Sequence, residues 1–244
     1  MIKTKQYRNE WKYVCQEADI TYICQRLGGM LDRDPHGDEG RYSIHSLYFD
    51  DFMDSCVLET EAGVSKRFKY RIRYYGDDPK FLSLERKEKL DGRCFKKSCR
   101  LSLEQYRDII CGDYEKLLFE TDNDVLRQFC ICARTRLFTP RAIIDYERTA
   151  YVEPITNIRV TADRNISVSG NVDSFLSGDY LRVPVMLEGK HVLEVKFDHI
   201  LPRSVRNVIT HENMIQTSFS KYYLGRKRLN MIGGHLYEHS FRSN

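Results

Sequence analysis

The chain has 244 residues, of which 41% are hydrophobic and 12% aromatic, enough for one substantial folded core. Its 39 Lys and Arg residues nearly balance 35 Asp and Glu residues, so the formal net charge is only +4. This balance excludes the large positive excess typical of nucleic-acid-binding domains. No apolar run approaches the 18 residues of a membrane span, so we expect no membrane-spanning segment.

The eight cysteines show no CxxC pair and no accompanying histidine cluster, which argues against a structural zinc site. The N-terminal residues 1–13 lack the apolar core and cleavage site of an export signal. Reduced thiols and a cytoplasmic location are therefore expected.

The first predicted strand alternates ionisable side chains with others: Arg8, Glu10 and Lys12 share one side. A helix is predicted over residues 17–31, ended by a glycine pair, and a strand over residues 42–50.

Residues 68–89 give the strongest signal, because two predicted strands each carry charge on one side. Lys69, Arg71 and Arg73 alternate with apolar residues, and the second strand places Lys87 beside further ionic groups. Such alternation is ordinarily interpreted as an open sheet with one solvent-exposed face. Three cations about 7 Å apart repel one another, however, and would instead attract a polyanion.

The rest of the chain alternates helices and strands. Residues 93–100 form a strand whose register is undecided, with Lys96 and Lys97 on opposite sides. Further strands are predicted at residues 141–151, 157–163 and 191–197. Helices are predicted at residues 102–110, 113–119, 124–137, 202–211 and 218–228. We expect a single domain over residues 1–232 and a loosely ordered tail over residues 233–244.

Strands with one ionic side fit poorly in a sandwich, whose buried face must be apolar. The pattern instead predicts an α+β fold, an antiparallel β-barrel tunnel with a charged lumen and helices packed on the outside.

In this arrangement the chain resembles the VTC (vacuolar transporter chaperone) polyphosphate polymerase domain, a branch of the CYTH-like triphosphate tunnel metalloenzymes. The resemblance covers about residues 6–228. The motifs that carry it are Arg8-x-Glu10-x-Lys12-Tyr13, Ser46-Leu47-Tyr48-Phe49-Asp50, Lys69-x-Arg71-x-Arg73-Tyr74-Tyr75-Gly76, Glu85-x-Lys87-x-Lys89, Tyr146-x-Arg148-x-Ala150, Arg159-x-Thr161-x-Asp163, Leu193-Glu194-Val195-Lys196 and Phe219-Ser220-Lys221-Tyr222.

The resemblance implies roles for these residues in holding phosphates and a divalent metal, Mn²⁺ or Mg²⁺. The implied phosphate ligands are Lys12, Lys69, Arg71, Arg73, Lys87, Lys89, Lys97, Arg148, Arg159, Lys196 and Lys221. Among them, the implied catalytic residues are Arg71, Arg73, Lys87, Arg148 and Lys221. Glu194 would be the main metal carboxylate, and Glu10 and Glu85 would either assist it or neutralise a lysine across the sheet.

The implied activity is transfer of the γ-phosphate of ATP to a growing polyphosphate chain, a reaction that needs charge neutralisation more than covalent catalysis. A metal-dependent triphosphatase acting on tripolyphosphate or nucleotides, and a non-catalytic polyphosphate-binding module, remain alternatives. The sequence has no SPX domain and no membrane helices, so it resembles free-standing bacterial members. Any membrane protein partner would be a separate polypeptide.

Overall fold

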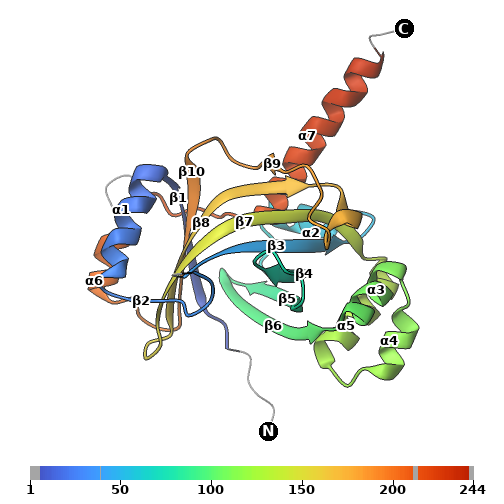
Figure 1. The fold of residues 1–244 in the computed structure, drawn as a ribbon, viewed down its shortest axis with the longest axis horizontal. Helices are drawn as coiled ribbons and strands as arrows, with labels where there is room; N and C mark the ends of the chain where they lie inside the picture. The colour runs from blue at the N-terminus through green and yellow to red at the C-terminus, as the bar shows by residue number, and fades with distance from the viewer. Residues whose placement is uncertain (1–5, 39, 211–213, 242–244) are drawn as a thin grey trace.

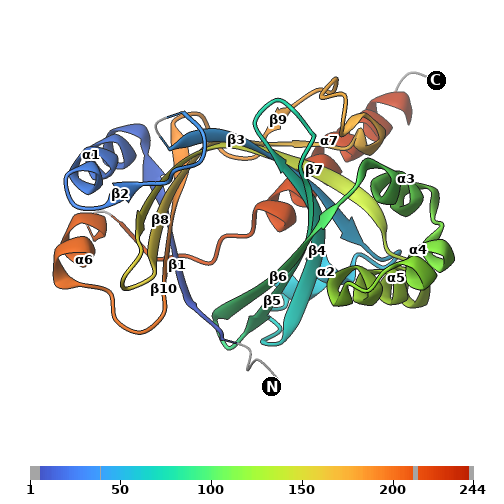
Figure 2. The same ribbon diagram turned by 60° about the horizontal axis from the view of Figure 1, so that its bottom comes forward.

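The fold is a strongly curled antiparallel sheet with helices on its outer side. The computed structural model describes residues 6–38, 40–210 and 214–241. Along the sheet the strands follow the order β1 (Asn9–Gln16), β10 (Lys190–Phe197), β8 (Ile158–Ser169), β7 (Thr139–Glu153), β3 (Arg41–Asp50), β4 (Arg67–Tyr75), β5 (Leu82–Leu90) and β6 (Arg93–Leu101). Two short strands pair at the side, β2 (Asp32–Arg33) with β7 and β9 (Val183–Pro184) with β8. Figure 2 shows the strands of the sheet curling into an arch.

The two outermost strands meet at one isolated bridge, which brings the curled sheet towards closure. The Arg8 amide donates to the Cys94 carbonyl at 2.8 Å, and the Cys94 amide donates back at 2.9 Å. The curled sheet thus approaches closure between β1 and β6, which share this bridge rather than a continuous ladder in the described part of the chain.

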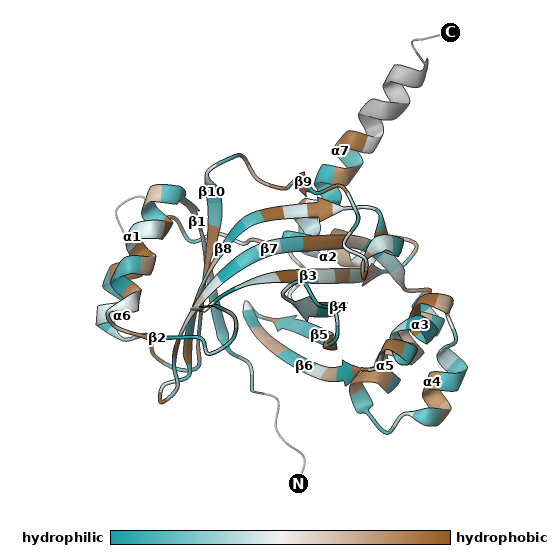
Figure 3. Cartoon of the chain, in the orientation of Figure 1, coloured by the Kyte–Doolittle hydropathy of each residue, from teal (hydrophilic) through white to brown (hydrophobic). Residues whose placement is uncertain are grey.

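Two groups of helices cover the convex side of the sheet (Figure 1). Helices α1 (Glu17–Gly28) and α6 (Arg203–Ile209) pack on one wall, where Ile20, Ile23 and Ile209 are fully buried. Helices α3 (Leu103–Cys111), α4 (Tyr114–Glu120) and α5 (Asp124–Arg136) cover the opposite wall over β5 and β6. Hydrophobic and hydrophilic segments accordingly alternate along β3, β7 and β8 in Figure 3. The α+β class with external helices is confirmed.

The last helix, α7 (Lys221–Phe241), begins at one end of the hollow and then projects from the molecule (Figure 1). It approaches the sheet closely at Gly225, where an added Cβ would lie 2.5 Å from Ile144 Cδ1 and 3.1 Å from Val168 Cγ2. It also contacts the short helix α2 (Ser55–Glu61).

Two expectations about the C-terminal part of the chain need correction. The helix predicted to end at Arg228 continues through Gly233 to Phe241; the loosely ordered tail expected over residues 233–244 stays a prediction. Gly233 lacks a positive φ, so it lowers helix propensity here without providing the turn that ends a helix. The helix predicted over residues 202–211 ends at Ile209, and His211 lies outside the described residues. Within the described part of the chain, none of the helices is long and apolar enough to cross a membrane.

Candidate functional site: a cation-lined tunnel

The hollow inside the arch is a cavity of about 1270 Å³. Among the described residues, thirteen lysines and arginines line it against four carboxylates. Ten of the eleven phosphate ligands implied by the sequence lie on its wall: Lys12, Lys69, Arg71, Arg73, Lys87, Lys89, Arg148, Arg159, Lys196 and Lys221. The predicted inward orientation of the ionic strand faces is therefore confirmed.

Lys97 is the exception, because it lies on the face of β6 turned away from the cavity, opposite Arg86 on β5. Its neighbour Lys96 lines the cavity instead and lies opposite Lys87. Charged residues alone could not fix the register of β6, because the strand carries one lysine on each side. The backbone pairing of β5 with β6 decides which side faces inward.

One wall, built by β1 and β10, holds two ionised carboxylates among three lysines. Glu10 Oε1 lies 2.6 Å from Lys87 Nζ and Glu10 Oε2 lies 3.1 Å from Lys12 Nζ. Glu194 Oε1 lies 2.5 Å from Lys196 Nζ, and Glu194 Oε2 lies 3.4 Å from Lys12. Burial alone would raise the pKa of Glu194, but Lys196, Lys12 and Lys87 outweigh it and hold that pKa well below its usual value. Both groups are therefore carboxylates at neutral pH.

The opposite wall, built by β4 and β5, is organised around Glu85. This carboxylate is almost fully buried, and its Oε2 accepts from Arg71 Nε at 2.7 Å and lies 2.6 Å from Arg71 Nη2. Its Oε1 accepts from Lys96 Nζ at 2.8 Å, and Arg73 Nη1 lies 3.8 Å away. Glu85 therefore fixes three cations that face the cavity.

A second buried carboxylate, Asp163 on β8, was not predicted as a site residue. Arg148 donates to it through two nitrogens, at 2.7 and 2.8 Å, and Lys221 at the start of α7 donates at 2.6 Å. These cations outweigh the effect of burial and lower the pKa of Asp163 to about 2. Asp163 thereby joins α7 to the tunnel wall.

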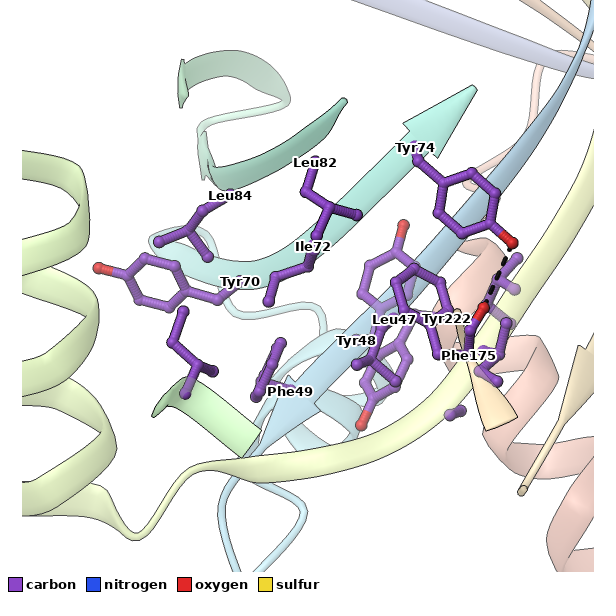
Figure 4. Packing of buried hydrophobic residues seen from close by; sticks show 14 of the residues in the cluster. Leu47, Tyr48, Phe49, Tyr70, Ile72, Tyr74, Leu82, Leu84, Phe175 and Tyr222 are labelled. Carbon is purple, nitrogen blue, oxygen red and sulfur yellow. Dashed lines mark hydrogen bonds between the residues drawn. The ribbon is translucent and has the colours of Figure 1, made fainter. Parts of the chain in front are cut away.

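Tyr48 is a further lining residue that the sequence analysis passed over, although it lies within the quoted motif Ser46-Leu47-Tyr48-Phe49-Asp50. Its hydroxyl accepts from Arg71 Nη1 at 2.7 Å, and its ring stacks on that of Tyr222 with centroids 5.0 Å apart (Figure 4). Burial would raise the pKa of Tyr48, but Arg71 and Arg73 outweigh it and lower the pKa to about 8. Its position on the same strand side as Ser46 was the signal that could have identified it.

Lys69 has a hydroxyl as its partner, whereas Lys87 and Lys221 have carboxylates. Its Nζ donates to Ser220 Oγ at 3.0 Å and lies 5.4 Å from the centre of the Tyr222 ring. No ion pair joins it to any carboxylate of the described chain. Burial, aided by Arg67 and Lys87, lowers the pKa of Lys69 to about 8. Such an ammonium would be stabilised by an anion arriving in the cavity.

The three carboxylates assigned to a metal by resemblance are not brought together. Glu10 and Glu194 share Lys12 and Lys196 on one wall, whereas Glu85 lies on the other wall among its own cations. No group of three or more His, Cys, Asp or Glu residues in the described ranges is arranged to hold a metal ion. Mg²⁺ is commonly held by one or two carboxylates and substrate phosphates, and the Glu10 and Glu194 pair fits that pattern.

The sheet topology and the cavity define a tunnel-shaped protein with a cation-lined interior. The family model described as "VTC domain" matches residues 7–230, and the chain belongs to this family. A comparison with curated proteins finds no match.

Among solved structures, the chain is similar to two proteins of Pyrococcus horikoshii OT3. PH1819 is 13% identical with a TM-score of 0.43, covering 91% of this chain and 98% of that chain. PH1012 is 11% identical with a TM-score of 0.42, covering 82% and 84%. The inorganic triphosphatase NE1496 is 11% identical with a TM-score of 0.29, covering 89% and 97%. With TM-scores this low, these likenesses do not bear on the chemistry of the cavity.

Proposed function

We propose that the protein is an ATP-dependent polyphosphate polymerase, which transfers the γ-phosphate of ATP to the end of a polyphosphate chain inside the tunnel. The length of the cationic lining carries this proposal. On β4 alone the lining cations run from Arg67 to Arg73, which is about 20 Å along an extended strand. A triphosphate contacts only part of that length, whereas a polymer of phosphates can use all of it.

Two arginines are fixed in orientations suited to phosphoryl groups. Arg71 uses three of its five N–H groups on Glu85 and Tyr48, which leaves two for a phosphate. Arg148 uses two on Asp163, which leaves three. Because these guanidiniums are already held in place, they stabilise the charge on the transferring phosphoryl group without reorganising.

The proposed reaction is an in-line displacement. A terminal oxygen of the polyphosphate chain forms a bond to the γ-phosphorus, and the bond from that phosphorus to the bridging oxygen of ADP breaks. Lys69, Lys87 and Lys221 would neutralise the phosphates on either side of the reacting atom. The displaced electron pair stays on the terminal phosphate of ADP, and ADP leaves.

Glu194 and Glu10 are the residues that would hold a divalent metal in this scheme. When bound, Mn²⁺ or Mg²⁺ would supply charge neutralisation at the phosphate oxygens. Lys12 and Lys196 would exchange part of their present contact with the carboxylates for contact with phosphates. Glu85 has a different role in the proposal. Its carboxylate already contacts Arg71, Lys96 and, more distantly, Arg73, and it orients Arg71.

Water is the competing acceptor, since a cavity of about 1270 Å³ admits water as well as phosphate. The test is incubation of the purified protein with ATP and Mn²⁺, followed by gel electrophoresis of the products. Long phosphate chains that disappear in Arg71→Ala and Glu194→Ala support the polymerase. ATP consumption yielding only orthophosphate would assign a triphosphatase instead. Salt-sensitive binding of polyphosphate without turnover would identify the protein as a polyphosphate-binding module instead.

The separate membrane protein partner stays a prediction.

A further inference from the structure

Three aromatic side chains come from β3, from the end of β4 and from the connection to β5, and we call them the aromatic mouth: Tyr42, Tyr75 and Phe81. All three line the cavity. Two of them are well exposed, Tyr75 at 45% and Phe81 at 62% of their surface. Exposed rings on the wall of a cavity rich in cations require an explanation, because phosphates make no use of apolar surface.

Two of the rings flank the connection between β4 and β5. The β4–β5 ladder ends at Arg73 opposite Ser83, and Tyr75 and Phe81 lie two residues beyond these partners, at the two ends of the connecting loop. Tyr75 also contacts Tyr42 edge-on, with ring centroids 5.7 Å apart. The mouth is therefore formed by β3, β4 and the connection to β5.

The rings are also held in place by neighbouring guanidiniums. Arg100 Cζ lies 4.5 Å from the centre of the Phe81 ring, and Arg73 Cζ lies 5.8 Å from that of Tyr75. A positioned ring loses little conformational entropy when a planar ligand stacks on it.

The spacing along β4 connects the mouth to the phosphate site. Tyr75 follows Arg73 by two residues on the same strand side, which is about 7 Å towards the rim. Arg73 is itself fixed by Ser46 and Tyr146, at 3.0 and 2.9 Å. A nucleotide whose phosphates reach Arg73 would thus carry its ribose and base outward to the rings.

We infer that the aromatic mouth is a nucleobase-binding site, in which Phe81 and Tyr75 stack on the base of the phosphate donor. This inference rests on the proposed function and deepens it, because it names the residues that bind the base of ATP. Stacking uses the π-face that every base has, so ATP and GTP are both accepted.

The test measures binding of ATP and of inorganic tripolyphosphate by calorimetry, with metal chelated so that no turnover occurs. Phe81→Ala is expected to weaken ATP binding by about 5- to 150-fold, the range of base–aromatic stacking. Tripolyphosphate binding should change less than about twofold, because it has no base. Phe81→Tyr should restore ATP binding. The high exposure of Phe81 means that its truncation leaves the core intact.

Phe119→Ala is the matched control, since Phe119 is a 91% exposed ring on α4 that does not line the cavity. This variant should leave both affinities unchanged. Equal losses of ATP and tripolyphosphate in Phe81→Ala, or no loss of either, would overturn the nucleobase site while leaving the phosphate tunnel in place. Wild-type protein that binds neither ligand would overturn the proposed function as well.

Discussion

Lys69 Nζ lies 3.0 Å from Ser220 Oγ, so an ammonium on β4 meets a hydroxyl at the N-terminus of α7 inside the tunnel. The hydroxyl does not neutralise the charge, and the pKa of Lys69 is lowered to about 8 by burial and by Arg67 and Lys87. The chain thereby keeps one cation ready for an incoming anion.

The first prediction concerns pH. Free Lys69 loses its proton as pH rises through about 8, whereas a bound phosphate holds the proton on the lysine. Polyphosphate affinity should therefore fall between pH 8 and pH 9.5, and binding near pH 8 should take up protons. Lys69→Arg keeps the charge at all these pH values, so calorimetry should show a smaller fall. An identical pH profile in the variant would contradict the assignment.

The second prediction concerns Tyr48. Its oxygen accepts from Arg71, so its own proton is available to a phosphate oxygen. Tyr48→Phe keeps the ring stacked on Tyr222 and removes only this donor. We expect kcat/KM to fall by about 10- to 100-fold, as for loss of a hydrogen bond to a charged group, with Tm nearly unchanged. Unaltered kinetics would show that the hydroxyl makes no contact with substrate.

The third prediction compares two glycines of α7. Gly225→Ala introduces a methyl group 2.5 Å from Ile144 Cδ1 and 3.1 Å from Val168 Cγ2, so these side chains or the helix must shift. We expect a loss of about 1–3 kcal/mol in the free energy of unfolding, and weaker phosphate binding because Ser220 and Lys221 move as well. Gly233→Ala meets no atom within 4 Å and should stabilise the protein by up to about 1 kcal/mol. Denaturant titration measures both, and equal effects would contradict the close packing at Gly225.

The fourth prediction separates the three candidate metal carboxylates. Glu194→Gln and Glu10→Gln should each raise the Mn²⁺ concentration for half-maximal activity by about 10-fold or more. Glu85→Gln should leave that concentration unchanged and instead lower stability by about 3–5 kcal/mol, because Arg71, Arg73 and Lys96 lose their shared partner. A Mn²⁺ requirement altered mainly in Glu85→Gln would reverse these roles.

Much of the tunnel could be predicted from alternation along the strands. Lys69, Arg71 and Arg73 share a side because side chains on a strand alternate, and this holds whatever the strand pairs with. The inward position of Lys96 depended instead on the pairing of β5 with β6. The adjacent lysines Lys96 and Lys97 lie on opposite sides of the strand, so the sequence does not indicate which side faces inward. Asp163 and Tyr48 were missed because their roles come from partners far along the chain, Lys221 and Tyr222.

The carboxylates that pair with the lining cations also determine how strongly ligand binding in the tunnel depends on salt concentration. Glu10, Glu194, Glu85 and Asp163 already neutralise much of the lining, so fewer mobile counterions need to condense there than thirteen cations would attract. At a lining lysine or arginine, an arriving phosphate then more often replaces a carboxylate of the protein than a mobile ion. Polyphosphate binding should accordingly weaken with ionic strength less steeply than the number of lysines and arginines alone would give, and a chain can advance by exchanging one bound anion for the next.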